Sequence, residues 1–86
     1  MMNETITITL KLFAVYQETL GLSEKAMVLP KGTTAGDVRD RLIADHPNLL
    51  AWKDLTRFGI NLKFTEASTL LQEGDELVLI PPVSGG

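Results

Sequence analysis

The chain has 86 residues, of which 44% are hydrophobic and 22% are charged, a composition typical of one small globular domain and not of a disordered segment. It contains no cysteine, which excludes a disulfide framework, a thiol nucleophile and a cysteine-ligated metal. Its formal net charge of -3 and its scattered cations argue against a nucleic-acid partner, and no apolar run approaches the roughly 20 residues that span a bilayer.

The first third of the chain is predicted to contain two strands and a short helical segment. Residues 1–7 lack the basic start and the long apolar stretch of a secretion signal, so we expect a cytoplasmic location. Apolar and polar side chains alternate over residues 6–13, which predicts a strand with one buried face and with Phe13 on its outward face. Residues 15–20 are predicted to form one or two helical turns before Gly21, and residues 26–29 to form a strand that pairs with the first.

The main helix is predicted from its cap. Thr34 and Asp37 form the pattern of a capping box, and apolar residues recur at helical spacing until Pro47 ends the helix at about His46. The elements predicted after it are a second, shorter helical piece, a strand, a turn and a last strand, over residues 48–55, 60–64, 73–76 and 77–80.

The order of these elements predicts an α+β roll, in which one main helix packs on a mixed sheet of four or five strands. The first and last strands are the most apolar, so we expect them side by side in the centre of the sheet. They should run parallel, because the connection between them carries the helix.

The last strand is apolar on both of its faces, so one face remains apolar even after the other joins the core. Val78 and Ile80, together with Phe13, are predicted to form an exposed apolar patch beside the C-terminal residues. The alternative is that the helical piece around Leu50 and Trp52 folds over this patch.

The last six residues are Pro81, Pro82, Val83, Ser84, Gly85 and Gly86. The prolines hold the chain extended and cannot continue a sheet ladder, and the glycines can enter a slot too narrow for a side chain. We therefore predict a domain over residues 1–80 and an extended tail over residues 81–86, whose reactive group is the α-carboxylate of Gly86. The alternative is a frayed chain end.

No other residues suggest a catalytic site. His46 is the only histidine, and we expect it to have a structural role at the helix C-terminus. Asp40 and Asp45 are expected on a solvated face, and the acidic residues of 73–76 in a turn from which they could also steer a basic partner. The chain is therefore predicted not to be an enzyme on its own.

Four features along the chain carry a family resemblance. They are Phe13-Ala14 with Glu18 and Gly21, Thr34 before Val38, Gly74-Asp75-Glu76 before the last strand, and the terminal Pro81-Pro82-Val83-Ser84-Gly85-Gly86. In these features the chain resembles the ubiquitin-like β-grasp sulfur carriers, and in particular the small subunits of molybdopterin synthase.

The resemblance implies a β-grasp fold and a role in molybdenum cofactor biosynthesis. An E1-like partner would use ATP to adenylate Gly86, and a persulfide sulfur donor would convert it to a thiocarboxylate, a C-terminal 1-thioglycine. The tail, residues 81–86, would then enter the large subunit of molybdopterin synthase within a heterotetramer and pass sulfur to cyclic pyranopterin monophosphate. The chain itself would bind no cofactor or metal and would be the non-catalytic subunit.

We predict that Phe13, Val78 and Ile80 form much of the docking surface for the partner, and that Gly85 is required for access of the tail. Two related functions stay open. A thiamin-pathway sulfur carrier uses the same glycine chemistry, although the segment 13–21 favours the molybdopterin branch. A ubiquitin-like modifier would instead attach Gly86 to lysine amines of other proteins.

Overall fold

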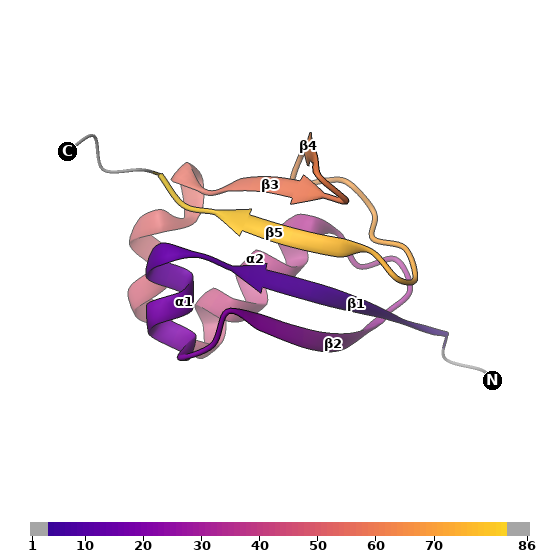
Figure 1. Ribbon diagram of the computed structural model, residues 1–86, viewed down its shortest axis with the longest axis horizontal. Helices are drawn as coiled ribbons and strands as arrows, with labels where there is room; N and C mark the ends of the chain where they lie inside the picture. The colour runs from indigo at the N-terminus through magenta and orange to yellow at the C-terminus, as the bar shows by residue number, and fades with distance from the viewer. Residues whose placement is uncertain (1–3, 83–86) are drawn as a thin grey trace.

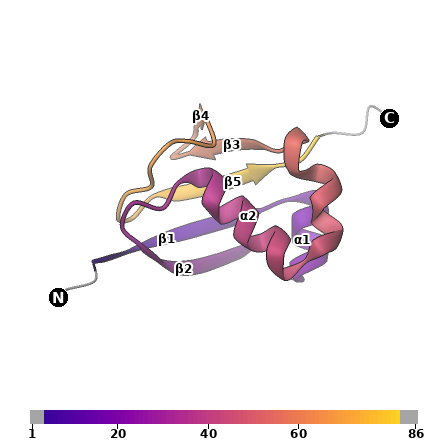
Figure 2. The same ribbon diagram turned by 180° about the vertical axis from the view of Figure 1, so that it is seen from behind.

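The computed structural model describes residues 4–82, in which a mixed sheet is covered on one face by helices (Figures 1 and 2). The elements are β1 (Thr5–Leu12), α1 (Ala14–Leu20), β2 (Glu24–Pro30), α2 (Ala35–Asp45), the 3-10 helix η1 (Pro47–Leu55), β3 (Arg57–Ile60), β4 (Lys63–Thr65) and β5 (Glu76–Ile80). The predictions made for residues 83–86 fall outside the described residues, and residues 1–3 also lie outside them.

The sheet order is β2-β1-β5-β3-β4, with β1 and β5 in the centre. β1 and β5 run parallel, with Leu10 opposite Leu77 and Leu12 opposite Leu79, whereas the other neighbouring strands are antiparallel. This confirms the predicted α+β fold and the predicted pairing of the first and last strands. The parallel pair is possible because α1, β2, α2 and the following segments supply a long crossover between the two strands.

The prediction of one strand over residues 60–64 is wrong. β3 ends at Ile60, the chain reverses through Asn61 and Leu62, and β4 begins at Lys63. Both turn residues have positive φ, 50° and 71°, which is the backbone geometry of a two-residue hairpin turn whose twist matches that of the flanking strands. The single predicted strand is therefore a hairpin, and the sheet has five strands among the described residues.

Smaller differences concern the ends of elements. β2 extends over residues 24–30 instead of 26–29, and β5 begins at Glu76, which was predicted to lie in the preceding turn. β1 ends at Leu12, so Phe13 is not a strand residue but the N-cap of α1. Backbone pairing with neighbouring strands extends β2 and β5 beyond the residues whose alternation was visible.

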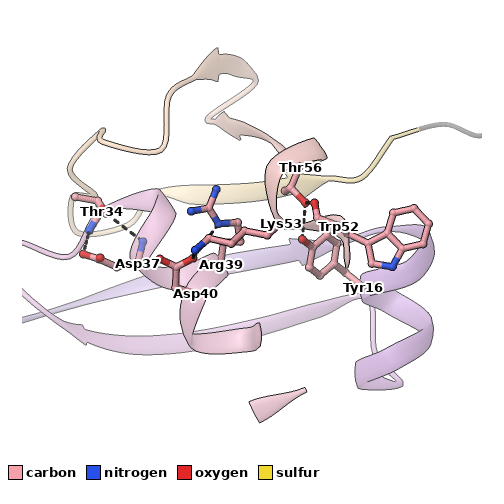
Figure 3. Close-up of polar contacts among 8 residues, drawn as sticks. All are labelled: Tyr16, Thr34, Asp37, Arg39, Asp40, Trp52, Lys53 and Thr56. Carbon is pink, nitrogen blue, oxygen red and sulfur yellow. Dashed lines mark hydrogen bonds and ion pairs between the residues drawn. The ribbon is translucent and has the colours of Figure 1, made fainter. Parts of the chain in front are cut away.

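The predicted capping box of α2 is confirmed. Thr34 Oγ1 accepts a hydrogen bond from the Asp37 amide at 3.1 Å, and the Thr34 amide donates to Asp37 Oδ2 at 3.0 Å (Figure 3). These bonds satisfy two amides that helix geometry leaves without partners. At the other end His46 is the C-cap, and its amide donates to the Leu42 carbonyl.

The core lies between the helices and one face of the sheet. It contains four alternate residues of β1, two of β5 and the inner faces of α1 and α2. Its most completely buried large side chains are Tyr16, Ile8, Leu10, Leu12, Leu29, Leu49, Leu77, Leu79 and Val38. The period of two in β1 therefore places its isoleucines and leucines inward and its threonines and Lys11 outward.

Candidate functional site

One face of the sheet carries no helix (Figure 1), and the residues predicted to bind a partner line a hollow on this open face. Leu77 and Leu79 of β5 are fully buried toward the helices, so the alternation of the strand turns Val78 and Ile80 toward this open face. Phe13 follows Leu12, which is paired with Leu79, and it therefore lies beside Ile80. Its side chain is 50% exposed.

A hollow of about 250 Å³ brings the three predicted residues together. It is lined by Phe13, Val78 and Ile80, and by four residues of the β3–β4 hairpin: Gly59, Leu62, Lys63 and Phe64. No residue of η1 lines it among the described residues, because Trp52 packs against the core on the other face of the sheet. The alternative in which the Leu50 and Trp52 segment covers the patch is therefore wrong.

Gly59 makes the floor of this hollow. It pairs with Val78 on one side and with Phe64 on the other, and a side chain at this position would project from the open face. A Cβ built on Gly59 would lie 3.8 Å from Val78 Cβ and 4.0 Å from Ile80 Cδ1, which is ordinary van der Waals contact. The absence of a side chain at Gly59 thus leaves the space that the neighbouring apolar residues surround.

The hairpin presents two large apolar side chains to solvent. Leu62 is 91% exposed and Phe64 is 79% exposed, and both line the hollow. Asn61 holds the turn in place, because its side-chain amide donates to Asp75 Oδ1 at 2.9 Å and its side-chain oxygen accepts from the Glu76 amide at 2.9 Å. The turn before β5 therefore positions the hairpin, although the two are far apart in the sequence.

The part of the open face beyond the apolar hollow carries charged side chains. Lys11 Nζ lies 2.7 Å from Glu24 Oε1 and 3.9 Å from Glu76 Oε2. The hydrogen bond to Glu24 and the attraction of its carboxylate raise the pKa of Lys11 above its usual value. Because Lys11 pairs in register with Val78, the apolar half of the face ends at this ion pair.

The chain leaves the sheet beside a second hollow, of about 450 Å³. Asp54, Leu55, Thr56 and Arg57 line one side, and Ile80, Pro81 and Pro82 line the other. Pro81 is buried and Pro82 is exposed. Neither proline has an amide hydrogen to donate to a neighbouring strand, so the ladder of β5 ends here. The predicted tail residues Val83, Ser84, Gly85 and Gly86 lie outside the described residues.

A buried hydrogen-bond chain holds the wall of this second hollow. The Tyr16 hydroxyl of α1 contacts Thr56 Oγ1, which itself donates to the Trp52 carbonyl at 2.8 Å (Figure 3). The single Thr56 proton is used on Trp52, so Tyr16 is the donor to Thr56. Burial raises the pKa of the Tyr16 hydroxyl above its usual value.

The acidic residues near β5 have structural partners: Glu73 accepts from the Thr7 amide, and Asp75 accepts from the Gln72 amide. Between residues 4 and 82 no group of three or more histidine or acidic side chains is arranged to hold a metal ion. No helix of the same range is long and apolar enough to cross a membrane.

The sequence alone did not identify Gly59, Leu62 and Phe64 as residues that line the apolar hollow. Asn61 was the available signal, because asparagine tolerates positive φ in a two-residue turn. Its usual glycine companion is replaced here by Leu62, and this replacement concealed the turn.

Comparisons with known proteins agree with this fold. A model of the ThiS family matches residues 10–86. The chain is similar to the molybdopterin synthase sulfur carrier subunit of Arabidopsis thaliana, with 32% identity over 82 residues, which cover 95% of this chain and 85% of that relative. It is similar to the crystal structure of SAMP1 from Haloferax volcanii, with a TM-score of 0.76 and 31% identity over 93% of this chain and 99% of that chain.

The fold is also that of a ubiquitin from Caldiarchaeum subterraneum, at a TM-score of 0.65 and 22% identity over 96% of this chain and 100% of that chain. The β-grasp prediction is thereby confirmed. Because the family match extends over nearly the whole chain, the chain belongs to the ThiS family of ubiquitin-like β-grasp proteins.

Proposed function

We propose that this chain is the sulfur carrier subunit of a molybdopterin synthase and that the α-carboxylate of Gly86 carries the sulfur. The family membership and the similarity to the Arabidopsis thaliana sulfur carrier subunit support this function. The structural observation that carries it is the apolar hollow of Phe13, Val78 and Ile80 beside the root of the Gly-Gly terminus. A carrier needs such a surface to dock while its end reaches another active site.

The chemistry starts from a poor electrophile. An α-carboxyl group has a pKa of about 3.5 and is ionised at neutral pH, so it must be activated before sulfur can attack. A carboxylate oxygen of Gly86 attacks the α-phosphorus of ATP on an E1-like partner, pyrophosphate leaves, and an acyl-adenylate forms. The terminal sulfur of a persulfide then attacks the acyl carbon and AMP leaves. A thiol cleaves the resulting acyl disulfide, which releases the thiocarboxylate.

The folded body presents this end to its partners. Pro81 and Pro82 direct the chain away from the sheet, and the terminal glycines allow entry into a narrow slot. Residues 1–80 thus form the docking domain, and residues 81–86 the tail that enters the large synthase subunit. There the thiocarboxylate donates sulfur to cyclic pyranopterin monophosphate.

Intact-mass spectrometry tests the proposal. After incubation with ATP, an E1-like enzyme and a persulfide donor, the chain should gain the mass difference between one sulfur and one oxygen, located at Gly86. The control is the chain without Gly86, which should keep its fold, gain no sulfur and support no transfer in the presence of the large subunit. Full transfer activity of the truncated chain would contradict the assignment of Gly86.

The similarity to SAMP1, a small archaeal modifier protein, supports a second candidate, in which Gly86 forms isopeptide bonds with lysine amines. Conjugates between Gly86 and lysines in a cell extract, without a thiocarboxylate intermediate passing to the synthase, would favour that function. A thiocarboxylate that serves the thiamin pathway but not the large synthase subunit would assign the chain to the thiamin branch.

A further inference from the structure

We infer that the β3 strand specifies what the docking partner must present: an apolar side chain that enters the hollow over Gly59, and a carboxylate that pairs with Arg57. This inference rests on the proposed function and names the recognition chemistry of the sulfur-accepting large subunit. Neither residue belongs to the patch that the sequence predicted.

The hollow over Gly59, called the socket from here on, lies on the open face. The walls of the socket are Val78 and Ile80 of β5, Phe64 of β4 and Phe13, and its floor is the backbone at Gly59. Phe13, Leu62 and Phe64 are exposed and apolar at its rim, and Lys63 is the charged residue beside them. An exposed apolar patch rimmed by a polar residue is typical of a protein interaction site. An inserted apolar side chain would bury the walls that now contact water.

Arg57 lies on the same face as Gly59, because the two are separated by one residue of β3, Phe58, which is buried toward the helices. Arg57 is exposed and is paired in register with Ile80, the last residue of β5 before the tail. It also lines the second hollow. It makes no ion pair within the described residues, unlike Lys11, Lys31, Arg39 and Lys53.

These positions define the spacing of the partner's groups. Two residues of a strand rise about 7 Å, so the apolar side chain and the carboxylate must lie about that far apart. An arginine binds a planar carboxylate through two parallel hydrogen bonds, which would fix the direction in which the tail leaves toward the partner. The socket supplies affinity, and Arg57 supplies orientation.

The test measures the affinity of the purified chain for its purified large synthase subunit. Gly59→Val fills the socket, and binding should weaken about 30-fold, the loss expected of a dominant interface contact. Gly59→Ala fills it only in part and should have a smaller effect. The unfolding midpoint of Gly59→Ala should not fall, since a Cβ at Gly59 meets no atom closer than 3.7 Å. The unfolding midpoint of Gly59→Val is measured alongside, so that its affinity is compared only under conditions in which it is folded.

Arg57→Glu should weaken binding about tenfold at low salt, and this loss should shrink as salt is added. The matched control is Lys25→Glu, which makes the same change in charge at an exposed position of β2, the far edge of the sheet. Its affinity should equal that of the wild type.

Wild-type binding with unchanged affinity in Gly59→Val and Arg57→Glu would overturn this inference and leave the proposed function intact. A wild-type chain that forms no thiocarboxylate and does not bind the subunit would overturn both. Dimerisation of the chain alone, lost in Gly59→Val, would assign the socket to a second copy and also overturn it.

Discussion

The hydrogen-bond chain of Tyr16, Thr56 and the Trp52 carbonyl should contribute measurably to stability, because it joins α1 to the segment between η1 and β3. Tyr16→Phe removes the donor to Thr56 and leaves the bond from Thr56 to Trp52 in place. The loss is one buried hydrogen bond, about 1 kcal/mol of unfolding free energy. For a domain of this size the melting temperature should fall by roughly 4–8 °C.

Thr56→Val has a larger expected effect, about 2 kcal/mol, because it removes both hydrogen bonds of the Thr56 hydroxyl and leaves the buried Tyr16 hydroxyl without a partner. The double variant should lose less than the sum of the two, since the Tyr16 hydroxyl is then absent. Urea unfolding of the four proteins at neutral pH measures this coupling. Strictly additive losses, or a Tyr16→Phe variant as stable as the wild type, would refute the reasoning.

The Tyr16 hydroxyl also makes the free energy of unfolding depend on pH, in a direction that its pKa fixes. Burial raises the pKa of folded Tyr16 above its unfolded value of about 10, so the neutral form is favoured in the folded state. Its stabilising contribution is complete below the unfolded pKa and is lost as the pH rises through the folded pKa. Because Tyr16 is the only tyrosine, the absorbance of tyrosinate reports this group alone. A folded protein that titrates at the ordinary value would contradict the prediction.

Three further substitutions test the docking face and the helix. Ile80→Lys should weaken binding to the large subunit at least about tenfold, since it places a charge among apolar side chains, with little change in the unfolding midpoint; equal affinity would remove Ile80 from the interface. Thr34→Ala should cost about 1 kcal/mol in urea unfolding through loss of the capping bond to Asp37, and an unchanged midpoint would show that the cap is dispensable. Gly36→Ala should destabilise the fold by about 1–3 kcal/mol, because a Cβ would lie 3.0 Å from Ala67 Cβ. A variant as stable as the wild type would show that the loop containing Ala67 can move to make room.

Much of the fold could be predicted from local patterns. The alternation in β1, the capping box at Thr34 and the stop at Gly21 each depend on neighbouring residues, and the structure confirms each of them. The parallel pairing of the first and last strands followed from the helix in the connection between them. The apolar character of both faces of β5 was also sufficient to place Val78 and Ile80 on the outer surface once Leu77 and Leu79 are inside.

The candidate site needed the tertiary structure where its parts come from distant strands. Leu62 in a two-residue turn is disfavoured by its own backbone preference, and Asn61 stabilises that turn through Asp75 and Glu76, which are remote in the sequence. No local pattern contains that information.

The amino-acid sequence by itself therefore determined which strand faces are apolar and where the main helix begins. The tertiary structure alone decided that Gly59 lies between Val78 and Phe64, and that Arg57 lies beside Ile80. The physical reason is that strand register is set by pairing between segments far apart in the chain, and a hollow exists only where such pairing brings a residue without a side chain between residues with large ones.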